Sequence, residues 1–175
     1  MWRQGVATDL DAPWTHSYQI SAYGINNAGL VVGSTKVPND VDYYRAVEWN
    51  DGVATFLEMP SGFDASEAKG INDAGQVVGF MSSEDFSIGF RAATWINGQV
   101  VDLNSLLPAS VVAEGWVLQG ANAINDMGQI VGQAYNTKTG VTDAFVLTPV
   151  PEAGTFAMML LGLGAVVAMG ARRRA

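Results

Sequence analysis

The stretch that decides the fold is AKGINDAGQVVG at residues 68–79. Two apolar runs flank an Asn-Asp-x-Gly turn, in which Gly supplies a positive φ and Asn or Asp can hydrogen-bond to its own backbone. Similar stretches are AYGINNAGLVVG at residues 22–33 and ANAINDMGQIVG at residues 121–132. The pattern therefore predicts three copies of one β-hairpin.

A second hairpin recurs between these copies. Trp2, Trp49 and Trp95 are each followed by Gly three residues later and by Leu eight residues later. Two of the turns contain Asp51-Gly52 and Asn97-Gly98, which are the strongest short hairpin signals. The tryptophans Trp49 and Trp95 are 46 residues apart. Two hairpins in each repeat make a four-stranded unit of the size of a β-propeller blade.

The sequence thus predicts an all-β domain over residues 1–149, with repeats at about 2–48, 49–94 and 95–147. A β-propeller-like body, partial or truncated, is favoured because closure takes four or more blades. A closed three-fold body, β-trefoil-like, is the alternative. We expect the natural N-terminus to lie upstream of Met1, because no secretory signal peptide precedes the repeats. Otherwise the strands of residues 2–10 would pair with residues 143–147 and complete the last blade.

The charge distribution divides the chain into an acidic region and a short basic C-terminal region. Residues 1–152 hold 6 Lys or Arg and 17 Asp or Glu, whereas the last 23 residues hold three Arg and no acid. An acidic body repels a phosphate backbone, so we expect no nucleic-acid binding. The chain has no Cys, which excludes disulfides, thiolate zinc sites and a cysteine nucleophile.

The C-terminal end has the composition of a membrane anchor. The 19 residues 153–171 carry no charge, and as a helix they would be about 28 Å long, which is close to a bilayer's hydrocarbon thickness. Arg172, Arg173 and Arg174 follow, and such a basic end stays on the cytoplasmic side. We predict a transmembrane helix over 153–171 with the acidic body across the membrane. The alternative is a buried core helix that ends in solvated arginines.

This end of the chain also carries a recognisable motif. Val150, Pro151 and Glu152, followed by an apolar span and the terminal arginines, resemble the PEP-CTERM sorting signal of Gram-negative bacteria that make exopolysaccharide. In the usual motif Pro follows Glu, and here Ala153 takes that place. The resemblance implies recognition by a membrane exosortase, processing near Pro-Glu, and release or transfer to the cell surface. It assigns residues 150–175 to a sorting segment.

The repeats themselves resemble a second family. Together with the stretch LNSLLP at 103–108 and the closing AFVLTP at 144–149, they are similar to the HAF family of bacterial extracellular repeats over residues 2–149. The resemblance implies a propeller-like fold and an extracellular location. Members are typically longer and begin with a signal peptide. No biochemical activity is attached to the family, so the resemblance implies no reaction.

Catalysis and metal binding have little support in the sequence. His16 is the only histidine and lies in a polar linker, and no Gly-x-Ser-x-Gly elbow exists to expose a nucleophile. The Asn and Asp residues of the repeats are hard oxygen ligands of the kind that calcium prefers, but turn formation already explains their spacing. We therefore predict no catalytic residue, no metal site and no cofactor.

Aromatic residues are the best candidates for ligand contact, because their rings can stack on sugar faces. Tyr43 and Tyr44 in a loop, and Trp116 in the longer third repeat, are predicted contacts, with burial as the alternative. Trp49 and Trp95 recur at a fixed phase, which favours packing between blades.

Three functions are consistent with these patterns. The leading hypothesis is a secreted, surface-sorted scaffold or adhesion module without enzymatic activity. Its expected partners are exosortase, the inner membrane through the C-terminal helix, and exopolysaccharide. Alternatives are the C-terminal fragment of a secreted propeller hydrolase or lyase, and a surface-layer component that assembles through open strand edges.

Overall fold

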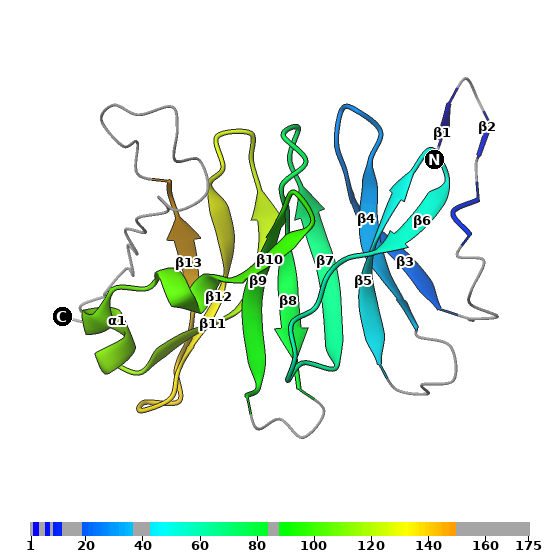
Figure 1. Ribbon diagram of the computed structural model, residues 1–175. Helices are drawn as coiled ribbons and strands as arrows, with labels where there is room; N and C mark the ends of the chain where they lie inside the picture. Colours follow the sequence, from blue (N-terminus) through cyan, green and yellow to red (C-terminus); the bar gives the residue numbers. More distant parts are fainter. Residues whose placement is uncertain are drawn as a thin grey trace.

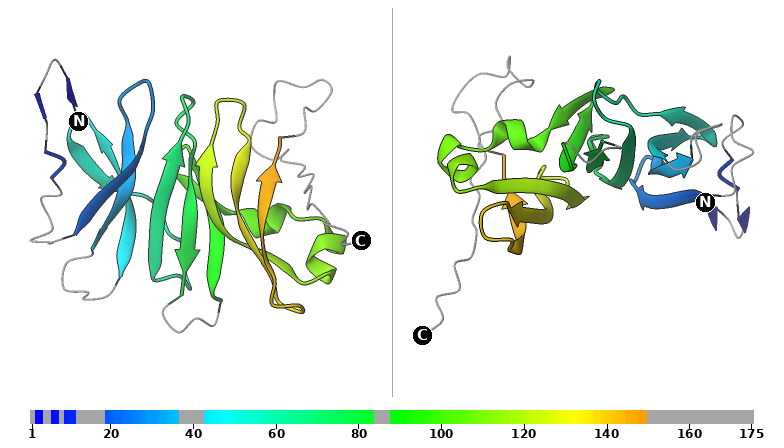
Figure 2. Two further views of the ribbon diagram at one scale, coloured as in Figure 1. Left: turned by 180° about the vertical axis from the view of Figure 1, so that it is seen from behind. Right: turned by 90° about the horizontal axis from the view of Figure 1, so that it is seen from below.

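The protein was analysed as a computed structural model, which describes residues 2–3, 6–7, 9–11, 19–36, 43–83 and 88–149. Over this part the chain is all-β, as predicted. Three antiparallel sheets of three or four strands stand side by side in an open row (Figure 1). The view from below shows the same row along the strand direction (Figure 2).

Each sheet is a meander in which consecutive strands pair. The first sheet comprises β3 (Ile20–Ile25), β4 (Val31–Lys36), β5 (Tyr44–Asn50) and β6 (Val53–Phe56). The second comprises β7 (Ala65–Ile71), β8 (Val77–Ser82), β9 (Phe90–Ile96) and β10 (Gln99–Asp102). The third comprises β11 (Trp116–Ile124), β12 (Ile130–Asn136) and β13 (Thr142–Leu147). The first two strands of every sheet form the Asn hairpin. The sheets therefore begin and end at other residues than the repeats predicted from the tryptophan spacing.

Smaller elements flank these sheets. Two short strands, β1 (Trp2–Arg3) and β2 (Val6–Ala7), pair with each other at one end of the row. The additional residues of the third repeat form a 3-10 helix, η1 (Leu103–Leu106), and a short helix, α1 (Ala109–Ala113). No helix in the described residues is long and apolar enough to cross a membrane, and the span predicted at 153–171 lies outside them.

The third sheet has three strands among the described residues, whereas the first and second sheets have four. Trp95 pairs with the first residue of β8 and Leu147 pairs with the first residue of β12, so the two positions are equivalent. Two residues later, Asn97 opens the β9–β10 turn with φ 52°, and Pro149 stands at the equivalent place. Proline holds φ near −65° and cannot form this turn.

Two further alternatives are not adopted by the described residues. Strand β1 pairs with β2, and no pairing joins residues 2–10 to residues 143–147. The strands also form no closed barrel, so the closed β-trefoil-like body is not what is observed.

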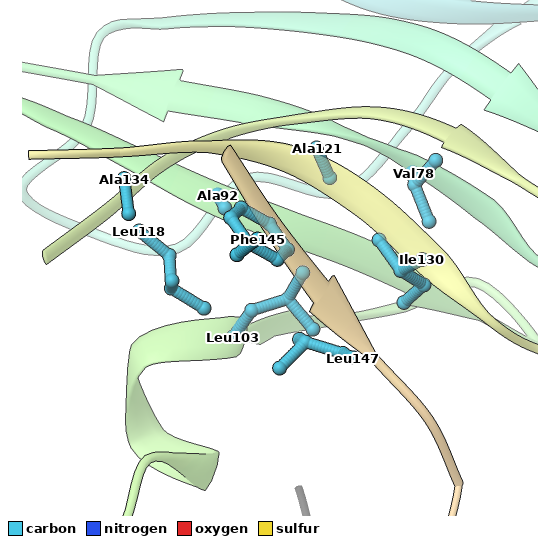
Figure 3. Close-up of a cluster of buried hydrophobic side chains, with 9 residues drawn as sticks. All are labelled: Val78, Ala92, Leu103, Leu118, Ala121, Ile130, Ala134, Phe145 and Leu147. Carbon is cyan, nitrogen blue, oxygen red and sulfur yellow. The ribbon is translucent and has the colours of Figure 1, made fainter. Parts of the chain in front are cut away.

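The core lies between successive sheets. Figure 3 shows the cluster between the second and third sheets, in which Val78 and Ala92 of the second sheet meet Leu118, Ile130 and Phe145 of the third. A second cluster joins Val32 and Ala46 of the first sheet to residues of the second, including Met81 and Trp95. Trp49 and Trp95 are 1% and 2% exposed, which confirms that both are core residues.

Candidate functional site

The Asn-Asp turns of the three hairpins form a ladder of hydrogen bonds across the row of sheets. Asn26 Nδ2 donates to the Asn72 carbonyl oxygen at 3.1 Å, and Asn72 Nδ2 donates to that of Asn125 at 3.2 Å. Beside them, the Asn27 N–H donates to Asp73 Oδ1 at 2.9 Å, and the Asp73 N–H donates to Asp126 Oδ1 at 2.8 Å. We call these six residues the turn ladder.

The ladder already uses both carboxylate oxygens of Asp73, and one of Asp126, as hydrogen-bond acceptors. Within each turn the Asn side chain also accepts a backbone N–H; for example, Asn72 Oδ1 accepts that of Gln76 at 2.9 Å. Hydrogen bonds from the backbone and then the side chain of Asn27 hold the pKa of Asp73 below its ordinary value. Among the described residues no three His, Cys, Asp or Glu side chains gather in a way that could hold a metal ion.

The first strands of the sheets come unusually close to one another beside the ladder. A Cβ added to Gly24 would lie 3.2 Å from the Gly70 Cα, and one added to Gly70 would lie 3.3 Å from the Ala123 Cα. Both distances are shorter than ordinary carbon contacts, so glycine permits the close approach. This packing and the ladder fix each sheet directly against the next.

A bulge interrupts each of these first strands at the same place. The register shifts between Ala22 and Gly24 in β3 and between Ala68 and Gly70 in β7, so Tyr23 and Lys69 are the extra residues. Asn122 occupies the equivalent position in β11. Bulges commonly redirect a side chain and occur next to functional sites.

The bulge residues begin a surface patch of aromatic and charged groups. Lys69 Nζ lies 3.9 Å from the centre of the Tyr23 ring and 2.5 Å from Glu67 Oε2. The same ammonium lies 5.6 Å from the Phe80 ring, which meets the Phe90 ring edge-on at 5.5 Å. Tyr23 is 46% exposed and Phe90 is 41% exposed. We call Tyr23, Glu67, Lys69, Phe80 and Phe90 the inner-strand patch.

This patch has the chemistry of a binding surface. Exposed ring faces offer apolar contact, and the adjacent ammonium and carboxylate can bond to hydroxyl groups. Sequence reasoning did not single it out, because a bulge depends on strand register. The available signal was the repeated Ala-x-Gly of residues 22–24 and 68–70, in which the middle residue alone differs.

The aromatic residues that the sequence nominated lie elsewhere and are not brought together. Tyr44 begins β5, its hydroxyl donates to Gln19 Oε1, and Lys36 Nζ lies 5.8 Å from its ring. Tyr43 precedes it and is half-buried. Trp116 begins β11, is half-buried, and packs against the core of the third sheet. The second sheet lies between them (Figure 1), and their role in binding stays a prediction.

Other nominated residues fall outside the described part of the chain. These are His16, the sorting residues Val150, Pro151 and Glu152, and the basic end Arg172, Arg173 and Arg174.

Comparison with known proteins places one motif on this chain. Residues 149–174 match the PEP-CTERM protein-sorting motif. No curated protein and no solved structure matched the chain. The motif implies export and a membrane-anchored precursor that exosortase processes.

Proposed function

We propose that the protein is a surface-sorted repeat module that acts, without enzymatic activity, as a scaffold or adhesion element in the cell envelope or the exopolysaccharide matrix. The observation that carries the proposal is the sorting motif at residues 149–174, which follows a body whose described residues form mainly stacked sheets. We also propose that the repeats are related to the HAF family, on the likeness of their three Asn hairpins and their Trp hairpins.

The turn ladder supports the scaffold part of this proposal. A module that bears load between a membrane and a matrix needs repeats that do not separate. Here each pair of neighbouring sheets shares a buried apolar cluster and direct hydrogen bonds between turns. Stability of such an array is a sum of repeat terms and nearest-neighbour interfaces, so strong interfaces make the row behave as one body.

The inner-strand patch supports the adhesion part. A sugar ring has apolar C–H faces and a polar rim, which fits an exposed tyrosine ring beside a carboxylate and an ammonium. Lys69 covers part of the Tyr23 ring and is held there by Glu67, so the polar groups are positioned before a ligand arrives. We therefore assign polysaccharide contact first to this patch and second to Tyr43, Tyr44 and Trp116.

Affinity electrophoresis of the full chain through gels that contain the host's purified exopolysaccharide tests this function. We expect the polysaccharide to retard the wild type, and Tyr23→Ser and Lys69→Ser each to weaken the interaction about tenfold, which is about 1.4 kcal/mol. Tyr44→Ser tests the second candidate set separately, and we expect it to weaken binding less than Tyr23→Ser does. Loss of binding in Tyr44→Ser but not in Tyr23→Ser would move the site to the loop aromatics. Absence of retardation in the wild type would overturn the adhesion role.

A further inference from the structure

The third sheet has an open edge where its neighbours have a fourth strand. In the second sheet, Ala93–Ile96 of β9 pairs with β10, and the equivalent residues after β12 are Phe145–Thr148. No strand of the described residues pairs with this outer edge of β13. Just before these four residues, the Asp143 carboxylate accepts the Ala144 N–H.

The outer face of the third sheet is also uncovered among the described residues. Val32 and Val78, in the first and second sheets, are fully buried by the next sheet in the row. Val131 is their equivalent by strand register, and it is 41% exposed. Val146, on the same face, is 42% exposed. The face thus has the composition of a buried inter-sheet surface without a sheet against it.

The opposite end of the row carries a fourth-strand sequence without a complete sheet. Residues 6–10 read VATDL, and the fourth strand of the first sheet with its next residue reads VATFL at 53–57. In the described residues β2 pairs only with the two-residue β1. Leu10 packs against the core of the first sheet, as Leu57 packs against that of the second.

A hydrogen bond from a tryptophan supports the same equivalence between the N-terminal residues and those that follow β6. Trp49 Nε1 donates to the Asp11 carbonyl oxygen at 3.2 Å, and Trp95 Nε1 donates to that of Glu58 at 2.6 Å. Leu10 and Asp11 therefore stand in relation to the first sheet as Leu57 and Glu58 stand to the second. They occupy the place from which a preceding sheet would contribute its last strand.

The two ends of the turn ladder are complementary in hydrogen-bonding polarity. At the third sheet, Asn125 Nδ2 turns back to Gln129 Oε1, and the Asp126 N–H has no partner among the described residues. These two groups are the hydrogen-bond donors that a sheet stacked on the third sheet would meet. At the first sheet, the Asn26 carbonyl and the Asn27 side-chain oxygen are the matching acceptors.

We infer that a second copy of this chain docks on the third sheet. The segment that follows β1 in one copy adds to the β13 edge of the other, and the first sheet of that copy stacks on the face that contains Val131 and Val146. One chain cannot make this joint within itself, because β2 and β13 lie at opposite ends of the row (Figure 1). Two such joints related by a two-fold axis close a dimer.

Disulfide trapping tests the inferred register, because the chain has no cysteine of its own. Thr8 aligns with Val101, which pairs with Thr94, and Thr94 is equivalent to Val146. We expect the double variant Thr8→Cys/Val146→Cys to form, under mild oxidation, a species of twice 18.5 kDa. The matched control is Thr8→Cys/Val112→Cys, in which the second cysteine is on α1 at a position that is 53% exposed.

A non-covalent measurement accompanies the trapping. We expect sedimentation of the full chain in mild detergent to show a dimer, Val146→Lys to shift it to monomer, and Val112→Lys to leave it unchanged. The inference is overturned by a wild-type monomer at all concentrations, by equal trapping in both cysteine pairs, or by a disulfide within one chain. It does not depend on the polysaccharide contact proposed above, which is measured separately.

Discussion

Removing the Asn72 side chain tests whether the turn ladder holds the sheets together. Asn72 is 4% exposed, and its side chain makes one bond within its own turn, from the Gln76 N–H, and one bond to the next sheet, to the Asn125 carbonyl. Asn72→Ala removes both bonds, although the Asn125 carbonyl keeps the bond from the Gly128 N–H. Each lost hydrogen bond costs about 0.5–1.5 kcal/mol, so we expect a loss of about 1–3 kcal/mol in the free energy of unfolding.

The third repeat offers a matched control. Asn125 closes the same kind of turn through bonds from the Gln129 and Met127 N–H groups, but it is exposed and makes no side-chain bond to a further sheet within the described residues. Asn125→Ala removes the turn bonds alone, and water replaces them, so we expect a loss of about 1 kcal/mol. The difference between the two variants measures the bond between sheets.

The assay is urea unfolding of the full chain in mild detergent, monitored by tryptophan fluorescence, since Trp49 and Trp95 are buried. A third variant, Asn72→Asp, keeps the acceptor in the turn but replaces the donor to Asn125, so it should resemble Asn72→Ala more than the wild type. Equal losses for Asn72→Ala and Asn125→Ala would refute the reasoning, because the ladder bond would then contribute nothing.

Three further predictions concern packing and pH. Gly79→Ala should lower the free energy of unfolding by about 3 kcal/mol or prevent folding, because the added Cβ would lie 1.9 Å from the Glu67 carbonyl oxygen. A midpoint of thermal unfolding within a degree of the wild type would contradict this. Burial raises the pKa of Glu48, so ionisation destabilises the fold as pH rises above about 4.5, and Glu48→Gln should raise the midpoint at pH 7 but not at pH 3. Hydrogen bonds lower the pKa of Asp73, so its contribution to folding stability is present at neutral pH and is lost as pH falls below about 3.8. Asp73→Asn should therefore reduce the loss of stability in acid. An unchanged acid dependence would count against the ladder bond to Asn27.

The sequence predicts the local structure of the repeats well because turn chemistry is local. Asp51 and Asn97 take positive φ values of 47° and 52°, each followed by a Gly that also has positive φ, as an Asp-Gly or Asn-Gly hairpin requires. The alternation of the strands and the fixed phase of the tryptophans predict the core in the same way. These signals reside within about ten residues of one another.

The candidate site could not be predicted to the same extent, because it depends on relations between repeats. The bond from Asn72 to Asn125 joins residues 53 positions apart, and it exists only because Gly70 lets the first strands approach. The contact between Lys69 and Tyr23 likewise needs bulges in two sheets at the same height. By contrast, Pro149 aligns with Asn97, so the sequence could have predicted that the β9–β10 type of turn is not repeated at that place.

The most direct test of the account is the location and mass of the protein expressed from its own gene in a Gram-negative host with exosortase. The sorting motif at residues 149–174 predicts a protein outside the cytoplasm whose C-terminus lies near Pro151 and Glu152. Deleting the exosortase gene should leave the unprocessed form in the membrane fraction. An uncleaved protein in the cytoplasm of both strains would contradict the account.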